Sequence, residues 1–321
     1  MITVLASRDG VVRKMPAIDP GWLAPDGNVT FWVDLSAPTP EEADILRRVF
    51  HFHELAVEDS LSESHHPKVE SYGWFLYLIL HGIDFEAAKH RFATHDTDFF
   101  VGPSYLVTVH DGTSRSIAAM REICERNEHV LEDGAVGLLH RIVDAMVDNY
   151  LPEVEKLSDR LERIEHRVFD DANGDLIKPI LTLKRDVASM RRVLLPQRDV
   201  VGRLARREFA IISEQLSYRF RDVYDHLVRL TDESMLFHDR LSSLLDAHLT
   251  SVSTRLNQVM KVLTVIATIF MPLTVLTGMW GMNVPLPVFP GSEGMQFWWL
   301  LGLMLAASGA MLWVFRLRRW M

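Results

Sequence analysis

The stretch VLTVIATIFMPLTVLTGMWGMNVPLPVFPGS, residues 262–292, contains no Asp, Glu, Lys or Arg. After Glu293 a second uncharged run extends from Gly294 to Phe315. A helix needs about 20 mostly apolar residues to cross a bilayer, so each run is long enough for one crossing. We therefore expect two membrane-spanning helices, near residues 259–280 and 297–316, joined by an outer loop of residues 281–296.

Basic residues flank both spans on what should be the same side of the membrane. Arg255 and Lys261 precede the first span. The second span is followed by Arg316, Arg318 and Arg319. The positive-inside rule then places both termini in the cytoplasm. The N-terminal stretch also lacks the apolar core of a signal peptide. These features predict an integral protein of the inner (cell) membrane that has the lipid bilayer as a partner.

The composition excludes several other classes of protein. A net charge of −9 provides no basic surface for nucleic acid. The single cysteine, Cys124, excludes a disulfide framework and a multi-cysteine zinc site. We find neither a phosphate-binding loop of the G-x-x-x-x-G-K-S/T type nor a nucleophile–base arrangement. We therefore expect neither an enzyme nor an organic cofactor.

The N-terminal part of the chain has an α/β pattern. Runs rich in β-branched and aromatic residues predict strands at 29–35, 74–80 and 104–110. Between the first two, TPEEADILRRVF (39–50) predicts a helix, because Thr39 and Glu42 can form a capping box with Pro40 in the first turn.

Long helices dominate the rest of the chain. We expect one arm over 135–169, a turn at 170–175, and a second arm broken near Pro196. From Ser213 to Trp280 only Pro272 interrupts the helical pattern, and 68 helical residues would span roughly 100 Å. The predicted fold class is thus α+β, divided into an α/β domain (1–134), helical arms and a stalk (135–258), and a transmembrane domain (259–321).

A stripe of small and polar residues follows this long helix at spacings of three and four. It comprises Asp239, Ser243, Asp246, Thr250, Ser253, Asn257, Met260, Thr264, Ala267, Met271, Thr274 and Gly278. A neighbouring stripe is apolar and includes Leu245, Leu256 and Val259. A simple coiled coil would be apolar at both seam positions, so the polar stripe favours a water-filled centre. The alternative is that small residues only allow close helix packing in the bilayer.

Several segments resemble the CorA-type divalent-cation channels. MKVLTVIATIFMPLTVLTGMWGMN (260–283) is similar to their first transmembrane helix and Gly-Met-Asn signature. RFRDVYDHLVRL (219–230) and LTSVSTRLNQVMKVL (249–263) resemble the stalk helix of that family. HELAVEDSLSESHHPKVESY (53–72) resembles its H-P-x-x-x-E-D segment followed by R-P-K. One departure is Trp280, where family members usually carry Tyr.

The resemblance implies a funnel-shaped homopentamer whose first spans line a pore for Mg²⁺, with Co²⁺ and Ni²⁺ as further ions. It makes Gly281, Met282 and Asn283 the selectivity mouth. Mg²⁺ gives up its water reluctantly, so amide and carbonyl oxygens there could bind the hydrated ion. We expect the pore to be lined by Asn257, Met260, Leu263, Thr264, Ala267, Met271, Thr274 and Gly278, and the cytoplasmic funnel by Asp246 and Thr250.

The resemblance also implies regulatory Mg²⁺ sites between subunits, with Asp59, Asp222 and Glu58 as ligands. The alternative is that these residues are ordinary carboxylates on the solvent-exposed surface, without a metal-binding role. No ionisable residue lies between Val262 and Ser292, and proton-coupled pumps commonly carry such groups at membrane depth. We therefore expect passive transport, driven by the membrane potential.

Two alternatives stay open at this point. A zinc or other transition-metal transporter could have the same architecture, and His51, His53, His65 and His66 are imidazoles of the kind that Zn²⁺ prefers. A membrane-anchored coiled-coil scaffold without transport is the second alternative, although it would need neither a polar seam nor a specific outer loop.

Overall fold

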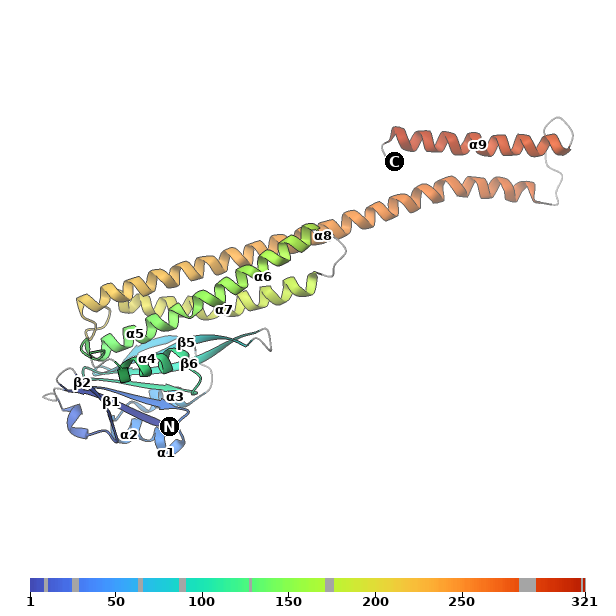
Figure 1. The fold of residues 1–321 in the computed structure, drawn as a ribbon. Helices are drawn as coiled ribbons and strands as arrows, with labels where there is room; N and C mark the ends of the chain where they lie inside the picture. The colour runs from blue at the N-terminus through green and yellow to red at the C-terminus, as the bar shows by residue number, and fades with distance from the viewer. Residues whose placement is uncertain are drawn as a thin grey trace. The chain divides into compact units, whose positions relative to one another are not determined.

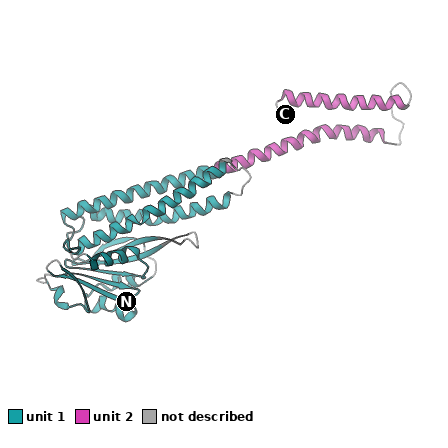
Figure 2. Cartoon of the chain, in the orientation of Figure 1, with its two compact units in different colours: residues 1–245 teal, residues 246–321 magenta. Residues whose placement is uncertain are grey.

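The computed structural model describes residues 1–8, 11–24, 29–62, 66–86, 91–126, 129–170, 176–282, 293–318 and 320 (Figure 1). Side chains of residues 84–93, 169–170 and 293 are also outside this description. The tertiary contacts divide the chain into two compact units, Met1–Leu245 and Asp246–Met321 (Figure 2). The division into three functional regions at residues 134 and 258 stays a prediction, because these contacts define units of packing.

The first unit contains a mixed sheet with the strand order β2-β1-β3-β7-β6-β5-β4 in the described residues. Its strands are β1 (Ile2–Arg8), β2 (Val11–Met15), β3 (Thr30–Ser36), β4 (Lys68–Ser71), β5 (Leu76–Glu86), β6 (Arg91–Val101) and β7 (Tyr105–His110). Only β3 and β7 pair in parallel. The three predicted strands correspond to β3, β5 and β7. The sequence interpretation missed β1, β2, β4 and β6.

Alternation along the strands gives the sheet two buried faces. In β5, Leu76, Leu78 and Leu80 belong to one apolar core, whereas Tyr77 and Ile79 belong to the other. Successive side chains of a strand point to opposite faces, so a strand buried on both sides is a nearly continuous apolar run. The first core also contains the helical arms, and the second contains the short helices near the N-terminus.

Three short helices follow β3: α1 (Pro40–Ala43), α2 (Ile45–Arg48) and α3 (Glu54–Leu61), of which α2 and α3 contribute side chains to the second core. A 3₁₀ helix, η1 (Pro20–Leu23), precedes them. The predicted capping box is confirmed, because Glu42 N–H donates to Thr39 Oγ1 at 3.3 Å and Thr39 N–H donates to Glu42 Oε2 at 3.0 Å. The single helix expected over 39–50 is wrong in one respect, since Asp44 separates α1 from α2.

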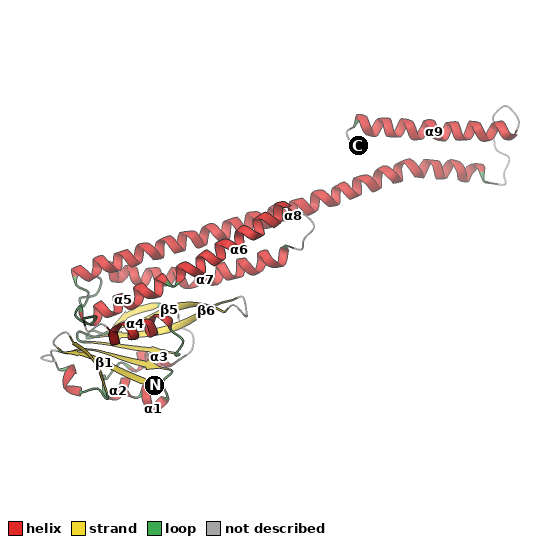
Figure 3. Cartoon of the chain, viewed as in Figure 1, coloured by secondary structure: helices red, strands yellow, loops and turns green. Residues whose placement is uncertain are grey.

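The helical arms are α4 (Arg115–Arg126), α5 (Gly134–Asp148), α6 (Tyr150–Asp170) and α7 (Ile177–Ala205). Figure 3 shows that the strands are confined to the N-terminal part of the chain. The first arm was expected as one helix over 135–169, but it divides at Asn149. The expected break near Pro196 is wrong, because α7 is continuous through it. Leu194 and Gln197 beside the proline are fully buried, so packing retains a helix that proline alone disfavours.

Two buried side chains attach the arms to the sheet. The amide oxygen of Gln197 accepts a 2.9 Å hydrogen bond from His81 N–H. The hydroxyl of Tyr150 donates a 2.8 Å hydrogen bond to the carbonyl of His81. His81 lies on β5 beyond Ile79, where the pairing with β4 ends. Gln197 and Tyr150 therefore bond to the backbone N–H and carbonyl of His81 at a point where β4 offers no partner. A buried backbone group without a partner would cost free energy, so the two contacts fix the arms against the sheet.

Helix α8 (Glu214–Trp280) has 67 residues and includes Pro272, as the sequence pattern predicts. Helix α9 (Glu293–Leu317) follows. Both contain a segment long and apolar enough to cross a membrane. The first unit fastens the start of α8 with ion pairs, since Arg219 lies 2.7 Å from Asp133, and Arg240 contacts Glu165 of α6.

Candidate functional site

The expected pore-lining residues lie on one face of α8. Successive residues of a helix are rotated by about 100°, so the expected funnel and pore-lining residues, from Asp246 to Gly278, fall within an arc of about 140° around the helix axis. In the single chain Met260 is 58% exposed, Leu263 57% and Met271 69%. The neighbouring apolar stripe is exposed as well, with Leu256 at 62% and Val259 at 60%. The single chain therefore does not distinguish a pore-facing side of α8 from a side facing lipid or another subunit, and the pore lining stays a prediction.

Threonines along this face have a defined orientation. The hydroxyls of Thr250, Thr264 and Thr274 donate to the carbonyls four residues earlier, at 2.8, 2.7 and 2.9 Å. Each hydroxyl therefore uses its proton inside the helix, and its oxygen retains acceptor capacity toward the outside. Such oxygens can accept hydrogen bonds from the water of a hydrated cation.

The C-terminal end of α8 carries the first two residues of the expected selectivity mouth. Gly281 N–H donates to the carbonyl of Thr277 at 3.0 Å, and Met282 N–H donates to that of Met279 at 3.3 Å. A Cβ added to Gly281 would lie 3.2 Å from the Thr277 oxygen. Gly281 is not among the residues with positive φ. The glycine is thus explained by close approach to a carbonyl and not by left-handed geometry. Asn283 lies outside the described residues.

The basic ends of the two apolar segments lie near each other within the second unit. A cavity of about 510 Å³ is lined by Asn257, Lys261 and Thr264 of α8 and by Arg318 and Trp320 after α9. The second unit therefore brings positive residues from both apolar segments to the same end of the helical pair.

The three expected regulatory acids occupy two places in the first unit. Glu58 and Asp59 are on α3, where Asp59 forms a 2.6 Å ion pair with Lys68. Asp222 is exposed on α8. Among the described residues of the single chain, no three His, Cys, Asp or Glu side chains are grouped so that they could hold a metal ion. A site at Asp59 and Asp222 would therefore need residues of two subunits, and the single chain does not test it.

Two further acids, which the sequence interpretation missed, lie on α5, and one of them, Asp144, interacts with Asp222. Asp144 and Asp148 are one turn apart on α5. Burial raises the pKa of Asp144, and the negative charges of Asp148 and Asp222 add to that rise, whereas His140 and His226 oppose it. The ring of His140 packs edge-on against Phe220 at 5.2 Å, which brings α5 and α8 together here. A carboxylate whose pKa is raised by neighbouring negative charges lies where a divalent cation would relieve repulsion.

The histidine cluster considered for zinc divides into different environments. His53 caps α3, with its Nδ1 accepting the N–H of Leu55 at 3.3 Å, and its ring lies 5.1 Å from that of Tyr72. His51 has a positive φ of 53°. His66 is exposed, and His65 lies outside the described residues. The capping bond gives His53 a structural role in the helix.

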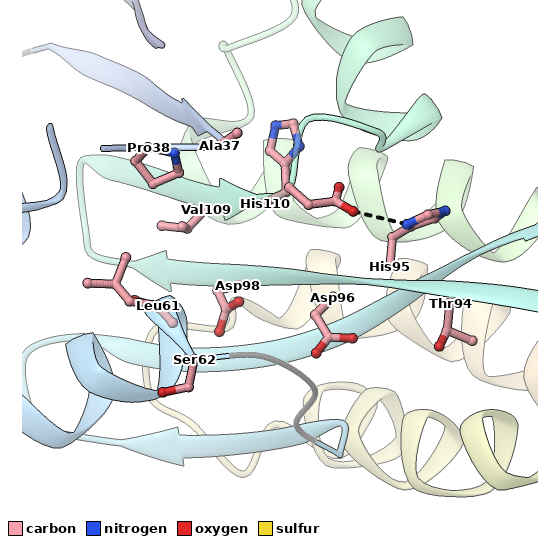
Figure 4. Close-up of a pocket in the computed structure, with 12 residues that line it drawn as sticks. Ala37, Pro38, Leu61, Ser62, Thr94, His95, Asp96, Asp98, Val109 and His110 are labelled. Carbon is pink, nitrogen blue, oxygen red and sulfur yellow. Dashed lines mark hydrogen bonds and ion pairs between the residues drawn. The ribbon is translucent and has the colours of Figure 1, made fainter. Parts of the chain in front are cut away.

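A polar pocket of about 420 Å³ opens on the sheet face that carries α3 (Figure 4). Asp96 and Asp98 of β6 line it, together with His95 and His110. The Nδ1 of His95 lies 3.1 Å from Asp111. Burial raises the pKa of Asp98 to about 7, although a hydrogen bond from the Tyr77 hydroxyl lowers it and the charge of Asp96 raises it.

His110 belongs to a buried network that contains charged groups. Its Nδ1 accepts the N–H of Gly112 at 3.0 Å, which leaves the proton of the neutral ring on Nε2, 3.1 Å from Asp34 Oδ1. The same Asp34 oxygen accepts a 2.7 Å bond from Thr108. Arg121 lies 3.6 Å from the other oxygen of Asp34. The carboxylate of Asp34 therefore has a positively charged neighbour and hydrogen-bond donors within the protein. A buried carboxylate needs such partners because it is removed from water.

The fold and the two apolar helices define a membrane protein built on a domain outside the bilayer. Comparison with known proteins makes the class specific: residues 27–319 match the family model described as CorA-like Mg2+ transporter protein. The chain belongs to this family. Its members are transporters or channels and not enzymes.

Individual relatives agree with this assignment. YfjQ of Bacillus subtilis is 33% identical over 285 residues, which cover 88% of each protein. The cobalt/magnesium transport protein CorA of Thermotoga maritima is 29% identical over 304 residues, covering 92% of this chain and 85% of that protein. The solved structure of the CorA magnesium transporter from Methanocaldococcus jannaschii has a TM-score of 0.82 at 23% identity, covering 98% and 97% of the two chains. The similarity in fold thus extends over nearly the whole length.

Proposed function

We propose that this chain forms a homopentameric, channel-like pathway for Mg²⁺ across the cell membrane, with both termini in the cytoplasm. The observation that carries the proposal is α8, a continuous 67-residue helix with the polar stripe on one face. The helix ends at Trp280, and Gly281 and Met282, the first two residues of the family signature, follow it directly. Five such helices around an axis would form a closed ring of equivalent contacts.

The chemistry of the stripe suits an ion that keeps its water. Threonine hydroxyls held by the backbone present oxygens as acceptors, and Asn257 and Asn283 add amide oxygens. Met260, Leu263 and Met271 would form apolar rings between them, and such constrictions can gate by loss of water. A narrow pathway of this kind binds a hydrated Mg²⁺ through its water, so the ion need not be stripped.

Transport in this proposal is passive. The absence of ionisable residues from Val262 to Ser292 leaves no proton-carrying group in the first span beyond Lys261 at its cytoplasmic end. A divalent cation moving inward gains about 4.6 kcal/mol per 100 mV of inside-negative potential. That energy is sufficient for uptake without coupling to a second reaction. Co²⁺ and Ni²⁺ are further ions that the same oxygens could pass.

The proposal includes regulation by cytoplasmic Mg²⁺ bound between subunits. Asp59 of one subunit and Asp222 of the next are the proposed ligands, with Glu58 beside them. The interaction of Asp144 with Asp222 supports this role, because a concentration of negative charge attracts a divalent cation. Ligand controls a gate only through different affinities for the closed and open states, so bound Mg²⁺ must favour the closed ring.

Ion flux into liposomes tests the transport function. Purified protein should pass Mg²⁺ when an inside-negative potential is imposed, and flux of Zn²⁺, Co²⁺ and Ni²⁺ measured in parallel gives the ranking. Native mass spectrometry of the same sample should show five copies. Zn²⁺ flux without Mg²⁺ flux would replace the proposal by the zinc-transporter alternative, and no flux of any ion would favour a scaffold.

The double variant Asp59→Ala, Asp222→Ala tests the regulation. We expect internal Mg²⁺ to inhibit flux less strongly, with permeation unchanged, because the variant removes charge only from the proposed regulatory site. Protection of the first unit from protease by Mg²⁺ should weaken in parallel. Unchanged inhibition together with unchanged protection would remove these residues from regulation and leave the pore proposal intact.

A further inference from the structure

Lys68 makes an unusual set of contacts beside the proposed regulatory acid. This lysine begins β4, and its Nζ lies 2.6 Å from Asp59 Oδ2 and 3.0 Å from Glu70 Oε1. The other carboxylate oxygen of Glu70 accepts a 2.9 Å hydrogen bond from the hydroxyl of Tyr72. The ammonium also lies 5.5 Å from the centre of the Tyr77 ring, within the range of a cation–π contact.

The register of the sheet explains why these groups meet. Lys68 and Glu70 are two residues apart on β4 and pair with Ile79 and Tyr77 of β5. Residues that pair directly across antiparallel strands lie on the same face. The side chains of Ile79 and Tyr77 belong to the core that also contains α3. The Lys68 ammonium therefore points to the side of the sheet on which α3 places Asp59.

The ammonium is a permanent charge in this position. Burial alone would lower the pKa of Lys68, but hydrogen bonds to Asp59 and Glu70 outweigh it and raise the pKa. The side chains of Lys68 and Asp59 are 31% and 27% exposed, so solvent screens the pair only in part. A cation that approaches Asp59 must therefore meet an ammonium already bound there.

We infer that Lys68 is a built-in competitor of the regulatory divalent cation, and that it sets the cation concentration at which the site at Asp59 fills. The inference rests on the proposed regulatory role of Asp59. Glu70 makes the exchange feasible, because Lys68 can leave Asp59 while it keeps its second carboxylate partner. The result is a weaker site, which empties when the cytoplasmic cation falls and does not stay saturated.

The experiment uses the full chain in lipid nanodiscs and the variant Lys68→Met, which keeps the length of the side chain and removes its charge. Mg²⁺ binding is followed by protection from protease and by calorimetry, with inhibition of flux measured separately in liposomes. Removal of a positive charge in contact with Asp59 should lower the half-maximal Mg²⁺ concentration about tenfold. Lys68→Arg, which keeps the charge, should stay within about twofold of the original chain.

Two controls separate this effect from other causes. Lys156→Met removes a lysine with a similar 2.7 Å contact, to Glu153 in the helical arms, and should leave Mg²⁺ binding unchanged. Lys68→Met combined with Asp59→Ala should show no shift relative to Asp59→Ala alone, since the competitor then has no site to contest.

The outcomes distinguish the inference from the proposal beneath it. An unchanged or higher half-maximal concentration in Lys68→Met, with the protein folded, would show that Lys68 only ties or orients Asp59 and would overturn the inference. In that case the regulatory role of Asp59 still stands if Asp59→Ala, Asp222→Ala weakens the response to Mg²⁺. If that double variant responds normally, both the regulatory role and the inference fall. A shift in Lys68→Met that persists without Asp59 also overturns the inference.

Discussion

The two units of the chain bury their apolar residues in opposite ways. In Met1–Leu245, large side chains such as Trp32, Phe99 and Phe220 are at most 1% exposed within one chain. In Asp246–Met321, Phe270 is 62% and Trp298 67% exposed. The first unit is thus stabilised by contacts inside the chain, whereas the apolar surface of the second unit is left for a bilayer to cover. The comparison teaches that the first unit contains its own core, whereas the second depends on its surroundings to bury its apolar side chains.

The largest expected effect is in the second unit and leaves the first untouched. Asn283→Ala should abolish Mg²⁺ uptake, because only the amide that binds the water of the ion is lost, while the pentamer stays intact. Gln258→Ala is the control, since it removes an amide of α8 that lies outside the polar stripe. Flux in liposomes at the original level for Asn283→Ala would exclude this residue from selectivity.

A matched pair of phenylalanine variants tests the comparison directly. Phe99→Ala should lower the free energy of unfolding of the first unit by about 3–5 kcal/mol, because it leaves a cavity in a closed core. Phe270→Ala should change it by less than about 1 kcal/mol. Thermal unfolding of both full-length variants in one detergent measures the difference. A large loss of stability in Phe270→Ala would instead show that this side chain packs tightly against a neighbouring subunit.

A smaller, graded effect is expected at the proposed constriction. Met271→Asp should wet the apolar ring and attract cations, which should change conductance or ion preference several-fold. Met271→Leu keeps the ring apolar and should behave like the original chain. If flux and ion preference both stay unchanged with Asp, Met271 faces lipid or a neighbour, and the stripe on α8 is assigned to the wrong face.

The smallest effect concerns the pH dependence of the first unit. The pKa of Asp98 is raised to about 7, so the folded state binds a proton more tightly than the unfolded state. The contribution of Asp98 to stability therefore decreases as pH rises from about 4 to 7. Asp98→Asn should remove this loss and flatten the dependence of melting temperature on pH over that range.

Asp111, in the same pocket, is a control of opposite sign. Burial would raise the pKa of Asp111, but hydrogen bonds from Thr113 outweigh it and the pKa is lowered. Its contribution to stability is therefore present above the pKa of the unfolded state and is lost as pH falls. Asp111→Asn should reduce stability at neutral pH and have little effect in acid. If both variants changed the dependence of stability on pH in the same direction, the opposite pKa shifts given for Asp98 and Asp111 would be wrong.

Local patterns determined much of this protein. An uncharged run of sufficient length predicts a membrane span, and helical periodicity predicts α8, because both depend on neighbouring residues alone. The capping box at Thr39 is a contact over three residues, and it was predicted correctly. The family resemblance likewise rests on continuous segments such as residues 260–283.

Only the tertiary structure decided the features that depend on distant contacts. The strand β6 and the continuity of α7 through Pro196 are held by packing, which overrides local preference. The same is true of Gln197, which bonds a strand 116 residues away, and of Asp144 on α5, which interacts with Asp222 on α8. Lys68 could be recognised as a partner of Asp59 only once the register of β4 placed its side chain on the face that carries α3. The physical reason is that sequence encodes the period of each element, whereas the partners of a side chain depend on how the elements pack.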